Sequence, residues 1–188
     1  SYAYVNGKRV ARLKGEGYFQ VSKDRKHPFV VQVGNLNIEV LGTCFNVYSY
    51  EENDFVETSL IEGSVRLYDS KSPSESFILK PSQKAIYSKN NGKISFHNTD
   101  NVKETAWTQN HLVFESEKLG SVFQKIERWY GVHIDLLCPE IANDQISGSF
   151  KDEQLPYVME ALKFQYGFNY EITGNNVTIN KSNQLKIK

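Results

Sequence analysis

The chain has 188 residues, which is enough for one large domain or two small ones. Its 22 basic and 22 acidic side chains balance, so the formal net charge is zero. This balance argues against nucleic acid as a partner, because neutralising phosphates requires clustered positive charge. No apolar run approaches the roughly 20 residues that a membrane-spanning helix needs.

The first residues indicate that the sequence is part of a longer protein. It begins with Ser1, and the residues on both sides of the Asn6-Gly7 turn already have the pattern of strands. It carries no signal peptide, so we expect any export or membrane-anchoring segment to lie upstream. A disulfide between Cys44 and Cys138 is one interpretation, but two unpaired, half-buried thiols are favoured.

Short segments with alternating apolar and polar residues fill the first 100 positions. Such alternation predicts strands with one face in a core and the other in water. Turn residues such as Gly34-Asn35 and Asn91-Gly92 separate the segments. We therefore expect an antiparallel β sandwich or roll over residues 1–100. The clearest alternating segments are 36–40, 56–60, 65–67 and 94–96.

After residue 100 the pattern changes, and residues 114–135 reappear in altered form at 150–171, at a constant offset of 36 positions. Apolar and glycine positions coincide between the two copies, which predicts one supersecondary unit used twice. The matched pairs include Phe114 with Phe150, Leu119 with Leu155, Val122 with Val158, Ile126 with Leu162, Tyr130 with Tyr166, and Gly131 with Gly167.

Each copy reads as strand, helix and strand. Apolar residues at helical spacing follow Ser116 and Asp152, which we expect to be N-caps, and Gly131 and Gly167 are expected to end the helices. Pro156 fits the first turn of the second helix. The predicted architecture is mainly β plus α+β. A linker at 101–110 leads into a duplicated βαβ–βαβ domain at 111–188, with both helices on one face of a small sheet.

No catalytic or metal-binding pattern stands out. The histidines at positions 27, 97, 111 and 133 lack metal-ligand spacing. Gly15 and Gly17 lead into a strand instead of a helix, so they do not form a phosphate-binding loop. We therefore expect no cofactor, no metal and no enzymatic activity.

Two features could bind a partner. Trp129 is matched by Gln165 in the second copy, so the shared core does not require an aromatic ring there; either a partner contact or packing against the first domain would explain it. The final strand, with Val177 and Ile179, could pair with a partner strand at a sheet edge. Alternatively, the lysines at positions 181, 186 and 188 guard that edge.

Several ordered motifs closely resemble the FecR family of membrane-spanning anti-sigma regulators. They are LKGEGYFQV with Gly15, Glu16 and Phe19, HPFVV with Pro28 and Phe29, VLGTCFNV with Gly42, Thr43 and Phe45, and IEGSV with Gly63. The segment LKPSQKAIY resembles the family's proline-glycine-glutamine turn, although Ser82 stands where glycine is usual. The segment from Trp107 to Phe114, with the doubled module and its Gly131 and Gly167, resembles the C-terminal domain of many such regulators.

The resemblance implies the periplasmic sensing region of a single-pass inner-membrane protein. Such a region relays a signal from the signalling domain of a TonB-dependent outer-membrane transducer. The sigma factor of the extracytoplasmic-function class binds a cytoplasmic segment, and contact with the membrane is made only by an upstream helix; both lie outside this sequence. The doubled module also resembles transducer signalling domains and secretin N-domains, which implies that the transducer docks on the second half.

Two other functions are weighed beside this one. A structural protein-interaction module of an envelope secretion or assembly complex would explain the secretin-like repeat. A carbohydrate-binding domain would use the 11 tyrosines and 2 tryptophans, but most aromatic residues alternate like core residues.

Overall fold

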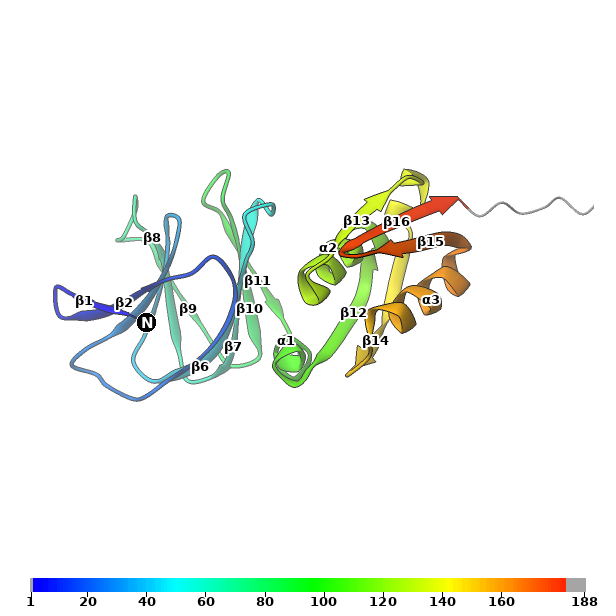
Figure 1. Cartoon of the computed structure of the whole chain (residues 1–188). Coiled ribbons are helices and arrows are strands. Elements are labelled where there is room, and N and C mark those ends of the chain that lie inside the picture. Colours follow the sequence, from blue (N-terminus) through cyan, green and yellow to red (C-terminus); the bar gives the residue numbers. More distant parts are fainter. Residues whose placement is uncertain (1, 182–188) are drawn as a thin grey trace, which may run out of the picture. The chain divides into compact units, whose positions relative to one another are not determined.

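The computed structural model describes residues 2–181, and the chain divides into two compact units, residues 1–108 and 109–188. The first unit is built almost entirely of strands (Figure 1). Its elements are β1 (Ala3–Val5), β2 (Lys8–Arg12), β3 (Gly15–Val21), β4 (Phe29–Val33), β5 (Leu36–Val40), β6 (Thr43–Ser49), β7 (Phe55–Glu62), β8 (Val65–Asp69), β9 (Ser76–Leu79), β10 (Gln83–Ser88), β11 (Ile94–Asn98), the helix α1 (Asn101–Thr105) and the 3-10 turn η1 (Ala106–Gln109).

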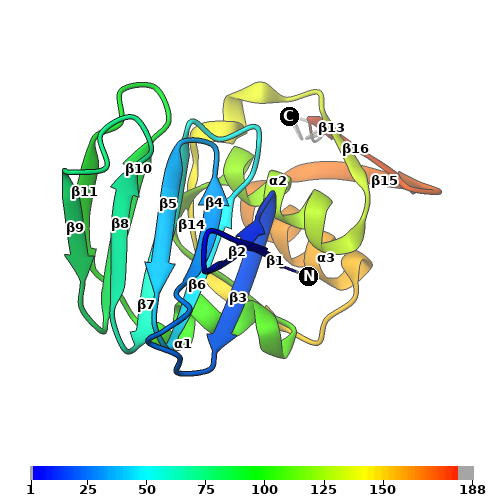
Figure 2. The same cartoon turned by 90° about the vertical axis from the view of Figure 1, so that its left-hand side faces the viewer.

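These strands form two sheets. One has six strands in the order β1-β2-β4-β5-β8-β9, and the other has five in the order β11-β10-β7-β6-β3. Figure 2 shows β5, β8 and β9 in succession at one end of the larger sheet. All neighbouring strands are antiparallel except β2 and β4, which are parallel. The parallel pair arises because β3, which lies between them in sequence, belongs to the other sheet.

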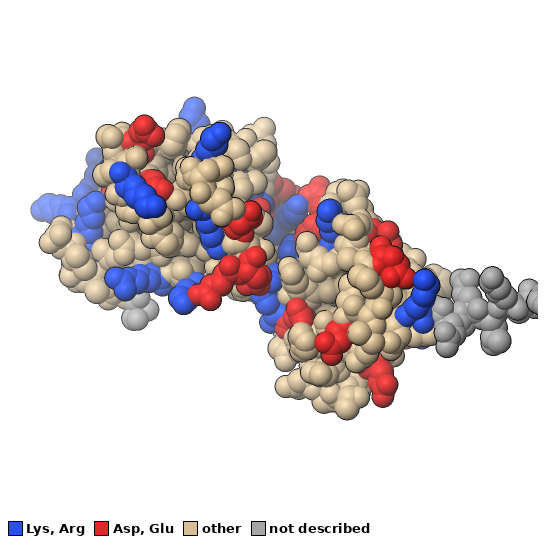
Figure 3. Space-filling model, turned by 90° about the horizontal axis from the view of Figure 1, so that it is seen from above, with Lys and Arg blue, Asp and Glu red and all other residues tan. Residues whose placement is uncertain are grey.

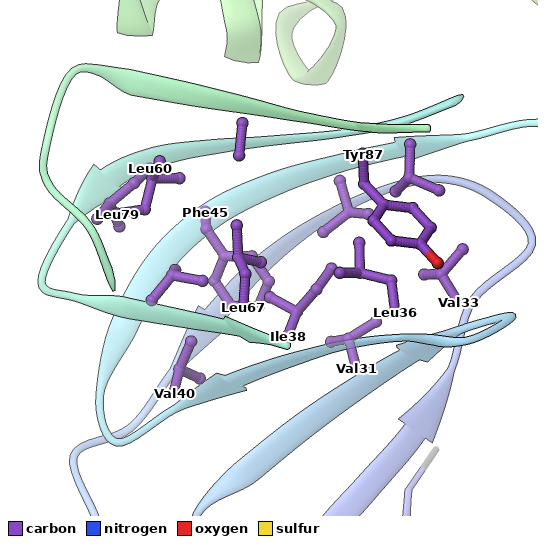
Figure 4. Close-up of a cluster of buried hydrophobic side chains, with 14 of the residues drawn as sticks. Val31, Val33, Leu36, Ile38, Val40, Phe45, Leu60, Leu67, Leu79 and Tyr87 are labelled. Atoms are coloured by element: carbon purple, nitrogen blue, oxygen red, sulfur yellow. The ribbon is translucent and has the colours of Figure 1, made fainter. Parts of the chain in front are cut away.

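The predicted alternation accounts for the core of the first unit (Figure 4). Leu36, Ile38 and Val40 of β5 are almost fully buried, as are Val65 and Leu67 of β8. They meet apolar residues of the five-stranded sheet in one cluster. The predicted sandwich is thereby confirmed, because side chains on the inner faces of both sheets fill the space between them.

Two glycines allow a close crossing of backbones at one end of this sandwich. A Cβ atom on Gly42 would lie 2.6 Å from the Cα atom of Lys23, and one on Gly63 would lie 2.9 Å from the Gly42 carbonyl oxygen. The Thr43 hydroxyl donates to the Ser64 carbonyl at 3.0 Å across the same crossing. No larger residue fits at either glycine unless the backbone moves.

The segment expected as a linker, residues 101–110, is instead mostly helical and is held to the first unit. Glu104 of α1 is the anchor. Its carboxylate lies 2.6 Å from Lys84 Nζ and accepts hydrogen bonds from the hydroxyls of Ser59 and Thr99. Lys84 also pairs with Glu57 at 2.9 Å. Asp100 caps α1 by accepting a hydrogen bond from the backbone of residue 102.

This partly buried network determines the charge states of Lys84 and Glu104. Burial alone would lower the pKa of Lys84, but the carboxylates of Glu57 and Glu104 outweigh it and raise that pKa. Burial would likewise raise the pKa of Glu104, but Lys84 and the two hydroxyls outweigh it and lower that pKa. Both groups are therefore charged at neutral pH, and α1 is tied to β7 and β10 by a satisfied ion pair.

The second unit contains two short sheets and two long helices. Its elements are β12 (His111–Lys118), α2 (Leu119–Tyr130), β13 (His133–Leu136), η2 (Pro139–Asn143), β14 (Gln145–Lys151), α3 (Leu155–Tyr166), β15 (Phe168–Thr173) and β16 (Asn176–Lys181). Strand β12 pairs with β14, while β16 lies between β13 and β15 (Figure 1). Residues from both sheets and both helices share one core.

The structure reproduces the sequence repeat. Helix α3 begins 36 positions after the start of α2 and ends 36 positions after the end of α2. Each helix is followed by a glycine in the left-handed conformation, Gly131 at φ 65° and Gly167 at φ 67°. Val113 of β12 lies directly opposite Ser149 of β14, and these two residues are also equivalent in the repeat. The two copies are therefore related by an approximate twofold rotation through this pair.

The prediction of one small sheet was wrong, because the strands of this module form two separate sheets. Strands β13 and β15 are equivalent in the repeat, so the rotation makes them run in opposite directions. A single strand between them must be parallel to one and antiparallel to the other, as β16 is. The first strands of the two copies pair separately as β12 and β14.

The expected N-caps were wrong, although the expected glycines do end both helices. Lys118 and Gln154 occupy the N-cap positions without a side-chain hydrogen bond, and each helix starts later than predicted. Ser116 and Asp152 instead adopt left-handed backbone conformations, at φ 49° and 55°. The polar residue in each copy therefore turns the strand toward its helix. Pro156 lies in the first turn of α3, as predicted.

We expect Glu104→Gln to destabilise the first unit by about 2 kcal/mol at neutral pH, because it removes hydrogen bonds to a charged group. Because the pKa of Glu104 is lowered in the folded state, its ionised carboxylate stabilises the fold at pH values above the ordinary pKa of a glutamate. This stabilisation is lost as the pH falls through the pKa of the folded state. The variant should therefore lose less stability in acid than the parent. Urea unfolding followed by Trp107 fluorescence, in a Trp129→Phe background, measures both effects; an unchanged acid dependence would contradict them.

Gly42→Ala should destabilise the first unit by about 3 kcal/mol, because the new methyl group overlaps the Lys23 backbone. Gly34→Ala is the matched control. Gly34 also has a positive φ, at 55°, but a Cβ atom there meets nothing within 4 Å, so about 1 kcal/mol is expected. The same fluorescence assay compares the two, and equal losses would show that the close crossing contributes nothing.

Candidate partner-binding surfaces

The described part of the chain offers no metal centre. Between residues 2 and 181, no group of three or more His, Cys, Asp or Glu side chains could hold a metal ion. Both cysteines are free, and Cys44 is half-buried as expected, whereas Cys138 is buried. No helix among the described residues is long and apolar enough to cross a membrane.

Most of the motif residues of the first unit support its fold. Phe19 stacks on Phe45 with ring centroids 5.1 Å apart and lies 6.1 Å from the ring of Phe29. The Pro28 carbonyl accepts a hydrogen bond from the Arg9 backbone and so positions the start of β4. Together with the crossing of Gly42, Thr43 and Gly63, these contacts form the apolar and backbone frame of the sandwich. The remaining motif glycine, Gly15, begins β3 with φ 91°.

The motif residues Trp107 and Glu16 are connected through the side chain of Asn46, which was not among the predicted site residues. The Trp107 indole N–H donates to the Asn46 side-chain oxygen at 3.1 Å, and the Asn46 amide donates to Glu16 at 2.8 Å. Asn46 is almost fully buried. Trp107 therefore holds η1 to β6 and β3, in addition to the Glu104 anchor of α1.

The predicted docking at the final strand is wrong. Val177 and Ile179 are fully buried, and β16 is the central strand of its sheet. Its hydrogen-bonding groups are shared between β13 and β15, so no partner strand can add to it. Lys181 belongs to this central strand, and Lys186 and Lys188 lie outside the described residues.

Trp129 is half-buried and packs against the core of the second unit. Its repeat equivalent, Gln165, is exposed. Packing within its own unit explains why part of the Trp129 ring is buried, and the rest of the ring is accessible to solvent. Trp129 stays a candidate contact for a partner.

The outer face of α3 is a surface that the sequence reading missed. Phe164 is 93% exposed and Tyr157 is 60% exposed. They lie seven positions apart, which is two helical turns, so both rings lie on one side of the helix. The repeat itself contains the signal: the equivalent residues of α2 are Arg128 and Ser121. The fold therefore does not require aromatic residues at these positions.

Charged and aromatic contacts hold the surroundings of this face. Lys163 Nζ lies 3.0 Å from Glu160, which lowers the pKa of the Glu160 carboxyl. The ammonium also lies 5.9 Å from the centre of the Tyr170 ring, and the Tyr170 hydroxyl donates to Glu160 at 3.2 Å. These contacts present a fixed polar group beside the two exposed rings. Aromatic anchors with a polar rim are typical of protein-binding surfaces.

The face shown in Figure 3 carries no large field of one charge. On the face shown in Figure 3, acidic and basic side chains are interspersed with uncharged residues. The balanced composition of the chain is thus also visible locally. An interface on such a surface depends on apolar anchors more than on long-range attraction.

Comparison with solved structures finds close likeness in fold. Two crystal structures of a "putative anti-sigma factor from Parabacteroides distasonis ATCC 8503" match the chain. The 1.65 Å structure has a TM-score of 0.82 and 29% identity, covering 96% of this chain and 84% of that chain. The 2.50 Å structure has a TM-score of 0.81 and 29% identity, covering 96% and 83%. Among curated proteins, none matches the chain.

Comparison with protein families accounts for both units. Residues 2–66 match the model described as FecR protein, and residues 111–179 match the model described as FecR, C-terminal. The first match lies within the β sandwich, and the second spans nearly all of the described duplicated module. The order of the two matches is the order that the sequence motifs predict. The chain therefore belongs to the FecR family of regulators.

Proposed function

We propose that this chain is the periplasmic sensing region of a transmembrane anti-sigma regulator. It relays a signal from the signalling domain of a TonB-dependent outer-membrane transducer to a sigma factor of the extracytoplasmic-function class. The sigma factor binds a cytoplasmic segment outside this sequence. Family membership and the likeness to an anti-sigma factor support the regulatory role.

The observation that carries the proposal is the exposed aromatic face of α3. A relay protein needs a surface that its partner binds with different affinity in two conformational states of the relay. The face formed by Tyr157 and Phe164 is absent from the otherwise equivalent helix α2, so it is a property of the second copy and not of the fold. We place transducer docking there, with the rings as anchors and the Glu160–Lys163 pair at the rim.

Two substitutions test this surface with residues that the fold already accepts. Phe164→Arg and Tyr157→Ser give α3 the residues that α2 carries at the equivalent positions. We expect the double variant to bind the signalling domain of the transducer encoded beside this protein about 30-fold more weakly, because aromatic hot spots contribute about 2 kcal/mol or more. Isothermal titration calorimetry with the 188-residue chain measures this change.

Gln124→Arg is the matched control, because it adds the same charge at an exposed position of α2. It should leave the affinity within about twofold of the parent, as expected for a residue outside the interface. Trp129→Gln, taken from the position of Gln165, tests the second candidate. If only Trp129→Gln weakens binding, the interface lies on α2, and the proposed α3 surface is wrong. If the parent chain fails to bind at tens of micromolar, the transducer relay itself is contradicted.

A further inference from the structure

The first unit contains a hollow whose lining includes none of the residues discussed as transducer contacts. Its volume is about 320 Å³. Its walls come from the loop after β3, the turn between β5 and β6, and strands β8 and β9. The lining residues used below are Lys23, Arg25, Leu41, Arg66 and Ile78, with Glu39 among the rest. We call it the basic hollow.

The loop that carries Lys23 and Arg25 is held by hydrogen bonds. The Asp24 backbone N–H donates to the Leu41 carbonyl at 2.8 Å. The Asp24 carboxylate accepts from the backbone of Lys26 at 3.0 Å and of His27 at 3.1 Å, and it also bonds the His27 ring at 2.9 Å. The close crossing at Gly42 presses the same loop against the turn. The two cations are therefore presented by a fixed backbone.

The charges around the basic hollow do not cancel. Glu39 is the acidic residue of its lining, and its carboxylate is already bound by Lys8 at 2.6 Å and lies 3.7 Å from Arg66. Arg66 is positioned further by stacking on Tyr68, with 4.9 Å between the guanidinium carbon and the ring centre. Within residues 2–181, Lys23 and Arg25 form no ion pair. A net positive site remains on a chain without net charge.

The same hollow has apolar walls and lies beside a free strand edge. Leu41 is 44% exposed and Ile78 is 58% exposed. Ile78 belongs to β9, the terminal strand of the six-stranded sheet, so one edge of β9 has no partner strand in that sheet (Figure 2). In the register of the sheet, Ile78 lies beside Arg66, and Arg66 lies beside Glu39. Ile78, Arg66 and Glu39 thus form one cross-strand row that leads away from the free edge.

From this arrangement we infer that the basic hollow binds an extended acidic peptide segment of a partner protein. Carboxylates of the segment pair with Lys23, Arg25 and Arg66, and its aliphatic side chains pack on Leu41 and Ile78. A small anion would satisfy the cations but would leave the apolar walls unused. This inference is independent of transducer docking on α3.

The test uses the ¹⁵N-labelled 188-residue chain and three acetylated, amidated peptides at constant ionic strength. The first alternates Glu and Val over six residues, the second replaces each Glu with Gln, and the third replaces each Glu with Lys. We expect the Glu peptide alone to shift amide signals of residues 23–25, 40–43, 64–66 and 76–79. The double variant Lys23→Glu, Arg25→Glu should weaken its binding about tenfold or more, since it reverses both unpaired cations.

Lys26→Glu is the control, because it reverses a charge on the same loop at a residue outside the lining of the hollow. The affinity of this variant for the Glu peptide should be within about twofold of that of the parent chain. Equal binding of the Gln peptide, or shifts spread over the whole surface, would overturn the inference. So would sodium sulfate, if it alone reproduced the shifts at residues 76–79, because that result would identify a small-anion site.

Discussion

The contact between Lys84 and Glu104 is the constraint that holds α1 to the first unit. Without it, α1 would lose its ion pair to β10 and its links to β7. The ion pair, completed by Glu57 and two hydroxyls, makes α1 a part of the β sandwich. Trp107 extends the attachment by one further turn through Asn46. Only Asn110 then separates η1 from the first strand of the second unit.

Much of the fold could be read from the sequence because it rests on local periodicity. The alternating segments became strands, and the apolar stripes became the buried faces of α2 and α3. The anchoring of α1 could not be read, because Glu104 meets Ser59 across 45 positions and nothing local indicates that pairing. The place of β16 was missed for a related reason. A run such as Val177 to Asn180 looks the same at the edge of a sheet as at its centre, and only the symmetry of its neighbours decides.

The candidate binding surfaces also divide into those that the sequence reveals and those that it does not. The residues that carry the family resemblance support the fold: aromatic packing at Phe19 and Phe45, and a close crossing at Gly42. They identify the family but do not mark a binding surface. The aromatic face of α3 was visible in the sequence as a difference between the two copies, once each position of one helix was compared with its equivalent in the other. The basic hollow was not visible, because its cations come from a loop and a strand that are far apart in sequence.

The pairing of Val113 with Ser149 has a consequence for the origin of the module. Equivalent residues that face each other across a dyad are the arrangement expected of a homodimer of half-length chains. Joining two such chains end to end preserves the dyad inside one polypeptide and frees each half to diverge. A homodimer would have to expose Tyr157 and Phe164 twice, whereas the fused module can reserve them for one side.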